Sequence, residues 1–161
     1  MVPKPHVALL PSTTEQLPML PTGSPIADAE KAFARARRAR RRAAVLHTVT
    51  RRRRCSARLR VLGDASLPVS AGAGGAVREI PLERITGTLE PTRAAMFDSD
   101  FRPAAGARAR WQRVWLAEHR GEVLPPISVT AVGDDYAILD GHHRVSVARA
   151  RGAATIVASL A

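Results

Sequence analysis

The fold is decided by the stretch Tyr136-Ala-Ile-Leu-Asp140-Gly141-His142-His143-Arg144-Val-Ser-Val-Ala148. Its first four residues favour a β-strand, and Gly141 can adopt the positive φ of a sharp turn. Residues 145–151 favour a helix that ends at Gly152. The sequence therefore predicts a strand, a tight turn and a helix in direct succession.

His142, His143 and Arg144 fall in the first turn of that helix. Unpaired backbone N–H groups and the helix dipole favour an anion there, by about 0.3–1 kcal/mol for the dipole at an exposed site. Arg144 can bind a phosphate through two N–H groups. Its alternative role is a salt bridge to an acid such as Glu79 or Glu122.

The two histidines and the two residues before them have alternative roles as well. Asp140 is expected to be the N-cap of the helix, and Gly141 is structural with or without a ligand. The histidines contact a phosphate, or one of them acts as a general acid or base near neutral pH, or they pack inside, bonded to backbone carbonyls. They diverge by about 100° on a helix, so we do not expect them to share a metal ion. The predicted phosphate or nucleotide site comprises Asp140, Gly141, His142, His143 and Arg144.

Positive charge is concentrated in one segment. The net charge is +11, and 13 of the 25 Lys and Arg residues lie in residues 31–60, which contain no Asp or Glu. Residues 77–161 hold 11 basic and 10 acidic residues. This pattern predicts a polybasic arm that binds nucleic acid non-specifically, or that is only a solvated Arg-rich tail. The expected nucleic-acid contacts are Arg37, Arg38, Arg40, Arg41, Arg42, Arg51, Arg52, Arg53 and Arg54.

The arm should begin as a helix. Ser24 and Pro25 form a good helix start, and we expect a helix over residues 25–42. Its arginines surround most of the circumference, so we expect it to project into solvent instead of docking on the domain. Phe33 is the only aromatic residue of the segment, which favours nucleic acid over a membrane surface as its partner.

Composition divides the chain into four parts. Residues 1–23 form a Pro-rich leader that we expect to be disordered, and residues 24–62 form the Arg-rich arm. Residues 63–76 are a linker rich in Gly, Ala and Ser, and the folded domain is expected over residues 77–161.

The domain has the pattern of an α+β fold, a small mixed sheet with packed helices. A strand that begins at Val77 should be followed by a turn that buries Leu82 and Ile85. The other expected elements are a helix over residues 104–120 with both tryptophans in the core, and strands over residues 127–132, 136–139 and 155–160.

Composition also bears on location. The one cysteine, Cys55, allows no internal disulfide and no Cys-based zinc site, which favours a reducing compartment. No run approaches the roughly 18 apolar residues of a membrane span. We therefore expect a cytoplasmic protein, associated with the nucleoid if the arm binds DNA.

The segment Ile138-Leu-Asp-Gly-His-His-Arg-Val-Ser-Val-Ala-Arg-Ala-Arg-Gly152, supported by Ile80-Pro-Leu-Glu-Arg-Ile85, resembles the ParB N-terminal-like domain of the ParB/sulfiredoxin superfamily. The resemblance covers residues 77–161. It implies a mixed α/β domain whose glycine turn and following helix bind the phosphates of a nucleotide. The implied ligand is a nucleoside di- or triphosphate, with or without Mg²⁺.

Departures from the family narrow the expected function. Partitioning ParB proteins carry Gly-Glu-Arg-Arg at this turn and use it to bind CTP, whereas His142 and His143 replace Glu and Arg here. They continue into a helix-turn-helix domain, which is not expected before Ala161. Sulfiredoxin has a reactive cysteine where this chain has His142, so sulfinic-acid reductase activity is not expected.

Our leading hypothesis is a ParB-like protein, related to chromosome-partitioning proteins, that binds a nucleotide or phosphate and is attached to nucleic acid through its arm. The alternatives are a nucleotide-dependent phosphotransferase or a ParB-like nuclease that uses the same pocket, and a protein whose partner is another protein. No catalytic residue can be assigned from the sequence, because nothing ranks the available acids Glu83, Asp98, Asp100 and Glu122.

Overall fold

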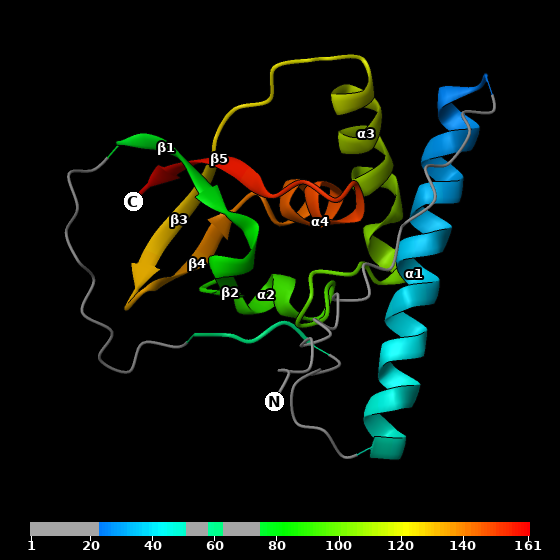
Figure 1. The fold of residues 1–161 in the computed structure, drawn as a ribbon, viewed down its shortest axis with the longest axis horizontal. Helices are drawn as coiled ribbons and strands as arrows, with labels where there is room; N and C mark the ends of the chain where they lie inside the picture. The colour runs from blue at the N-terminus through cyan, green and yellow to red at the C-terminus, as the bar shows by residue number, and fades with distance from the viewer. Residues whose placement is uncertain (1–22, 51–57, 63–74) are drawn as a thin grey trace, which may run out of the picture.

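The structure, a computed structural model, describes residues 23–50, 58–62 and 75–161. The predicted leader up to residue 22, most of the linker and the cluster Arg51–Arg54 lie outside these ranges. A five-stranded mixed sheet and the helices packed on it confirm the α+β fold (Figure 1).

The sheet has the strand order β1-β5-β3-β4-β2. Strands β1 and β5 are antiparallel, as are β3 and β4, whereas β3 runs parallel to β5 and β2 parallel to β4. The strands are β1 (Val77–Pro81), β2 (Ile85–Thr88), β3 (Ile127–Val132), β4 (Asp135–Asp140) and β5 (Thr155–Leu160).

The helices form successive layers beside the sheet. In Figure 1, α4 lies next to the strands, α3 lies beyond it, and the long α1 stands outermost. The helices are α1 (Pro25–Thr50), α2 (Pro91–Ala94), α3 (Arg108–His119) and α4 (His142–Ala150), with short 3-10 turns η1 (Leu82–Arg84) and η2 (Ala105–Ala107).

Most elements of the domain follow the sequence prediction. The strands β3 and β5 have the predicted bounds, and Leu82 of η1 and Ile85 at the start of β2 are both buried as expected. The helix predicted from residue 104 begins as η2 and becomes α-helical at Arg108. The strand β2 was not predicted, since its short Ile-Thr-Gly-Thr sequence forms a strand by pairing with β4.

Two apolar clusters form the core, and α4 belongs to both. The larger cluster lies against the sheet and includes Ile127, Ile138, Phe97 and Val145. The smaller one joins α1, α3 and α4 through Ala29, Phe33, Ala36, Trp111, Trp115 and Val147. Both tryptophans are buried, as predicted.

The prediction that the first helix projects into solvent is wrong, because α1 packs along α3. Phe33 is 3% exposed, and its ring lies edge-on to Trp111 with a centroid separation of 5.5 Å. Two turns further on, Arg40 donates to the carbonyl oxygens of Met96 at 3.1 Å and Arg102 at 3.3 Å. A narrow stripe of two alanines, a phenylalanine and an arginine therefore suffices to dock the helix; the docking stripe is Ala29, Phe33, Ala36 and Arg40.

The predicted start of the folded unit at residue 77 is also corrected. Leu59 is 2% exposed and lies in the larger cluster, and Val61 forms a parallel bridge to Thr88 beside the edge of β2. Residues 58–62, assigned to the arm from their charge, belong to the fold along with α1.

Truncation of the docking stripe should destabilise the protein. Phe33→Ala removes a buried ring, so we expect the free energy of unfolding to fall by about 3–5 kcal/mol, measured by chemical denaturation. Lys31→Ala, on the exposed side of the same helix, is the matched control and should change it by less than about 0.5 kcal/mol. Equal stability of the two variants would contradict the docking of α1.

Candidate functional site

The turn between β4 and α4 is fixed by Gly141. Its φ is 105°, the left-handed conformation that the sequence predicted. A Cβ on this residue would lie 2.4 Å from Cγ2 of Ile127, so the position excludes any side chain for two independent reasons. The glycine brings the first turn of α4 tightly against β3.

The predicted N-cap role of Asp140 is wrong. Gly141 occupies the N-cap position of α4, and within the described residues no side chain caps the helix. The Asp140 side chain is 74% exposed and lies 3.8 Å from the Nη2 atom of Arg144. The carboxylate is displaced by one residue because the left-handed glycine stands between it and the helix.

His142 and His143 are buried, at 4% and 6% exposure. The ring of His142 stacks on Phe97, and that of His143 meets Phe97 edge-on. Nε2 of His142 lies 2.7 Å from the hydroxyl oxygen of Thr88, so a side chain satisfies it, where a backbone carbonyl was expected. Nε2 of His143 is buried without a hydrogen-bond partner among the described residues.

Burial keeps both rings neutral near pH 7. Desolvation lowers the pKa of His142 and of His143 from the usual 6.5 to about 4, because the cation is less stable away from water. For His143 the guanidinium groups of Arg110 and Arg93 contribute to this lowering of the pKa, after burial. At neutral pH each ring can therefore donate one N–H, but neither contributes charge.

Arg144 supplies the buried charge at this turn. Its side chain is 13% exposed, and Nη1 is buried with no hydrogen-bond partner in the described part of the chain. Its ion-pair partner is Asp140, not the expected Glu79 or Glu122. Burial lowers the pKa of Arg144, and the neighbouring Arg110 acts in the same direction.

The residues of the predicted phosphate site lie together at the turn between β4 and α4, and two exposed arginines from other helices lie near it. Arg93 of α2 and Arg110 of α3 both act electrostatically on His143. Sequence reasoning did not name them, because they come from elements distant in the chain. Within the described ranges, no group of three or more His, Cys, Asp or Glu side chains is placed to hold a metal ion.

A second candidate site is the solvent face of α1. Residues i, i+4, i+7 and i+11 of a helix share one side, and a shift of two residues turns that side by about 200°. The docking stripe occupies one such side, and exposed cations occupy the opposite one. This basic stripe consists of Lys31, Arg35, Arg38 and Arg42.

The docking of α1 leaves some of the predicted nucleic-acid contacts exposed and turns others toward the domain. Arg38, Arg41 and Arg42 are exposed, and Arg37 is half-buried. The prediction that Arg40 contacts nucleic acid is wrong, because its guanidinium donates hydrogen bonds to carbonyl oxygens of the loop after α2. Lys31 and Arg35 were missed, although their spacing from Arg38 and Arg42 could have revealed the stripe.

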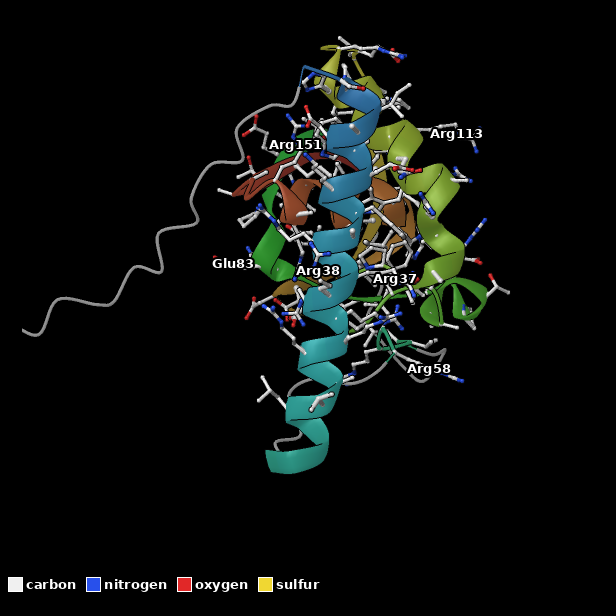
Figure 2. All side chains as sticks on the ribbon, turned by 90° about the vertical axis from the view of Figure 1, so that its right-hand side faces the viewer. Arg37, Arg38, Arg58, Glu83, Arg113 and Arg151 are labelled. Atoms are coloured by element: carbon white, nitrogen blue, oxygen red, sulfur yellow. The ribbon has the colours of Figure 1, made fainter. Side chains whose placement is uncertain are left out.

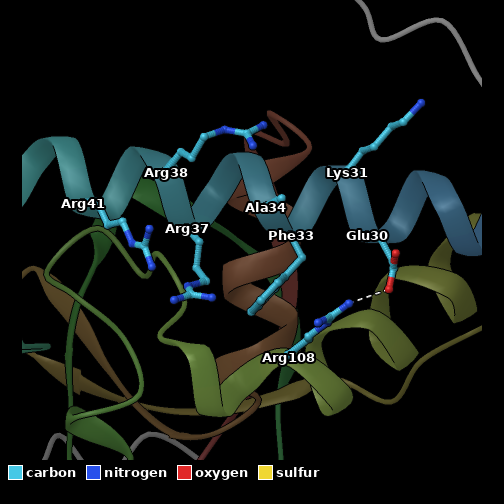
Figure 3. A pocket seen from close by; sticks show the side chains of 8 residues that line it. All are labelled: Glu30, Lys31, Phe33, Ala34, Arg37, Arg38, Arg41 and Arg108. Atoms are coloured by element: carbon cyan, nitrogen blue, oxygen red, sulfur yellow. Dashed lines mark hydrogen bonds and ion pairs between the residues drawn. The ribbon is translucent and has the colours of Figure 1, made fainter.

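The side chains of α1 also border a hollow of about 420 Å³ between α1 and α3. Figure 3 shows Arg37 and Arg41 reaching toward α3, whereas Lys31 and Arg38 point away from it. At the same place Arg108 of α3 forms an ion pair with Glu30. Cations therefore line both the outer side and one flank of the helix.

Comparisons of this chain with models of protein families, with curated proteins and with solved structures give no match. The resemblance to the ParB N-terminal-like domain stays a prediction from the motif. Among the described residues, no helix has a segment long and apolar enough to cross a membrane.

The histidine burial predicts a pH dependence of stability. Between about pH 6.5 and about pH 4 the unfolded chain binds protons that the folded chain does not, so the free energy of unfolding should fall as the pH falls through this range. Chemical denaturation across the range measures the slope. His143→Gln removes one of the two buried rings and should reduce the slope; a slope equal to that of the unaltered protein would contradict the assignment.

Proposed function

We propose that this protein binds nucleic acid through the basic stripe of α1. The proposal is carried by one observation: four exposed cations lie in a row along a helix whose opposite side is docked on the domain. Over residues 31–42 the row extends about 16 Å, at 1.5 Å per residue. A fixed row of this kind matches the regular spacing of backbone phosphates better than a mobile tail.

The electrostatics support the same ligand. The net charge is +11, and within the described residues none of the four stripe cations is neutralised by an acidic side chain. Phosphate contacts displace condensed counterions and provide affinity without sequence recognition. The expected activity is therefore salt-sensitive binding with little dependence on sequence.

Salt titration tests the proposal. The logarithm of the binding constant should fall linearly with the logarithm of salt concentration, by about 0.9 for each duplex phosphate contacted. The double variant Arg35→Ala/Arg38→Ala should bind more weakly and flatten this slope by about 1.8. Fluorescence anisotropy with a labelled duplex of about 20 base pairs, two helical turns, measures both quantities.

The matched control is Arg78→Gln. Arg78 lies on β1, at the far side of the molecule from α1 (Figure 1), and glutamine can still donate to the hydroxyl of Tyr136 that Arg78 binds at 2.8 Å. Equal loss of affinity in Arg78→Gln and in the stripe variant would reject the stripe as the binding surface.

The second candidate function is binding of a phosphate-bearing small molecule at the first turn of α4, a nucleoside di- or triphosphate by the ParB resemblance. It is favoured by Nη1 of Arg144 and Nε2 of His143, which are buried at the N-terminus of α4 and have no hydrogen-bond partner among the residues that the structure describes. Arg93 and Arg110 would supply the remaining charge. An anion there would pair with atoms that otherwise lack partners.

Ligand-induced stabilisation tests this second function. Pyrophosphate or ATP, with and without Mg²⁺, should raise the melting temperature, because a ligand at 100 times its Kd adds about 2.7 kcal/mol of stability. Arg144→Gln should abolish the shift, and Arg120→Gln, which removes an exposed cation on the far end of α3, should retain it. Release of phosphate from ATP in the same samples would show hydrolysis and favour the enzyme alternative, and equal shifts in the two variants would exclude the site.

A further inference from the structure

The two flanks of α1 carry different side chains, and a hollow lies beside each flank. Figure 2 looks onto α1, with α3 on one side of the helix and Arg151 on the other. The flank toward α3 carries Arg37 and Arg41 and borders the hollow of about 420 Å³. The opposite flank borders a larger hollow, of about 1020 Å³, between α1, α4 and the loop of residues 100–103. Three alanines of α1 line this larger hollow: Ala32, Ala36 and Ala39.

The inner surface of the larger hollow is apolar. The methyl groups of the three alanines form the wall on α1, and the buried Phe101, Pro103 and Trp115 lie on the domain side. Alanine side chains are too short to fill the space between α1 and these residues, so the space stays open. Its volume is at the upper end of the range for small-molecule sites, about 300–1,000 Å³, and such sites have mostly apolar walls.

The arginines on the domain side of the larger hollow already have partners. Arg102 forms an ion pair with Asp100, with 3.0 Å between Nη2 and Oδ2. Arg151 forms one with Glu118, with 3.8 Å between Nε and Oε2. Arg149 donates to two backbone carbonyl oxygens, at 2.7 and 3.0 Å. The domain side therefore offers a ligand little positive charge that is not already paired.

The arginines on the α1 side differ, because they lack such partners. Arg35 and Arg42 both line the larger hollow and are exposed, so they lie at its mouth. Neither forms an ion pair with an acid in the part of the chain that the structure describes. They are seven residues apart, about two helical turns. Apolar walls with two unpaired cations at the mouth suit a ligand with one acidic group better than a polyanion.

We propose that the larger hollow binds a small amphipathic organic anion, a molecule with an apolar body and one acidic group. The apolar body lies between the three alanines and the buried Phe101, Pro103 and Trp115. The acidic group reaches the mouth, where Arg35 or Arg42 donates a charge-assisted hydrogen bond to it. None of the five residues of the predicted phosphate site lines this hollow. The site is therefore a different one, and it does not depend on nucleic-acid binding.

Anilinonaphthalene sulfonate is a suitable probe, because it joins an apolar body to one sulfonate and its fluorescence rises when it leaves water. Titration into the full chain should show saturable binding of one probe molecule per chain. The neutral analogue phenylnaphthylamine has the same apolar body without the sulfonate. It should bind about tenfold more weakly, the usual effect of losing a hydrogen bond to a charged group.

A filling variant tests the apolar wall. Ala39→Phe places a ring in the space that the ligand would occupy, so the affinity for the sulfonate probe should fall at least about tenfold. Ala34→Phe is the matched control, because Ala34 is also half-buried on α1 but lines the smaller hollow toward α3. It should leave the affinity unchanged. The melting temperature of both variants is measured alongside, so that only folded protein is compared.

A pair of double variants tests the charge at the mouth without altering the apolar walls. Arg35→Gln/Arg42→Gln should weaken binding of the sulfonate probe by about tenfold and leave binding of the neutral analogue unchanged. Arg37→Gln/Arg41→Gln removes the same charge from the other flank of the same helix and should affect neither probe.

Four results would overturn the proposal. They are the absence of saturable binding, equal affinity for the two probes, equal affinity of the two phenylalanine variants, and equal affinity of the two glutamine pairs. Each of them would leave the nucleic-acid binding proposed above intact, since that function is measured separately with the labelled duplex.

Discussion

The contact on which this structure depends is the edge-on packing of Phe33 against Trp111. It joins α1 to α3 with a centroid separation of 5.5 Å. Trp111 in turn donates from its indole nitrogen to the hydroxyl of Ser146 on α4 at 2.9 Å, so a single buried aromatic residue connects three helices. Because α4 also packs on the sheet through Val145, the position of α1 is tied to the core of the domain.

The docking of α1 determines what the charge of this protein can do. A free Arg-rich segment attracts any polyanion, but a helix held along one side directs its cations in one direction. The docking stripe and the basic stripe are offset by two residues, so they lie on opposite sides of α1. Phe33 packs on the domain on one side, and Arg38 is exposed to solvent on the other. Arg40 lies on the docked side, where its guanidinium donates to backbone carbonyl oxygens and is therefore unavailable to a ligand.

The sequence predicted the elements whose signals are local. The strands β3 and β5 alternate or contain β-branched residues, and Gly141 was placed correctly because only glycine tolerates its backbone conformation. What depends on distant partners could not be decided from the sequence: burial of the histidines was one of two alternatives, and the docking of α1 was not predicted. The histidines turn inward because Phe97 and Thr88 receive them, and α1 docks because Trp111 lies opposite Phe33, so neither outcome is encoded near the residues concerned. A helix with one aromatic residue among many arginines resembles a solvated helix when its sequence is read without its packing partner.

The central claim is that α1 is docked and holds its cations in a fixed row. Amide hydrogen exchange at neutral pH tests it most directly, because exchange reports the free energy needed to open each backbone hydrogen bond. The account predicts that amides of α1 beside the docking stripe, such as those of Phe33 and Arg37, exchange as slowly as those of α3. Exchange of these amides at the rate of the isolated α1 peptide, with α3 still protected, would contradict it.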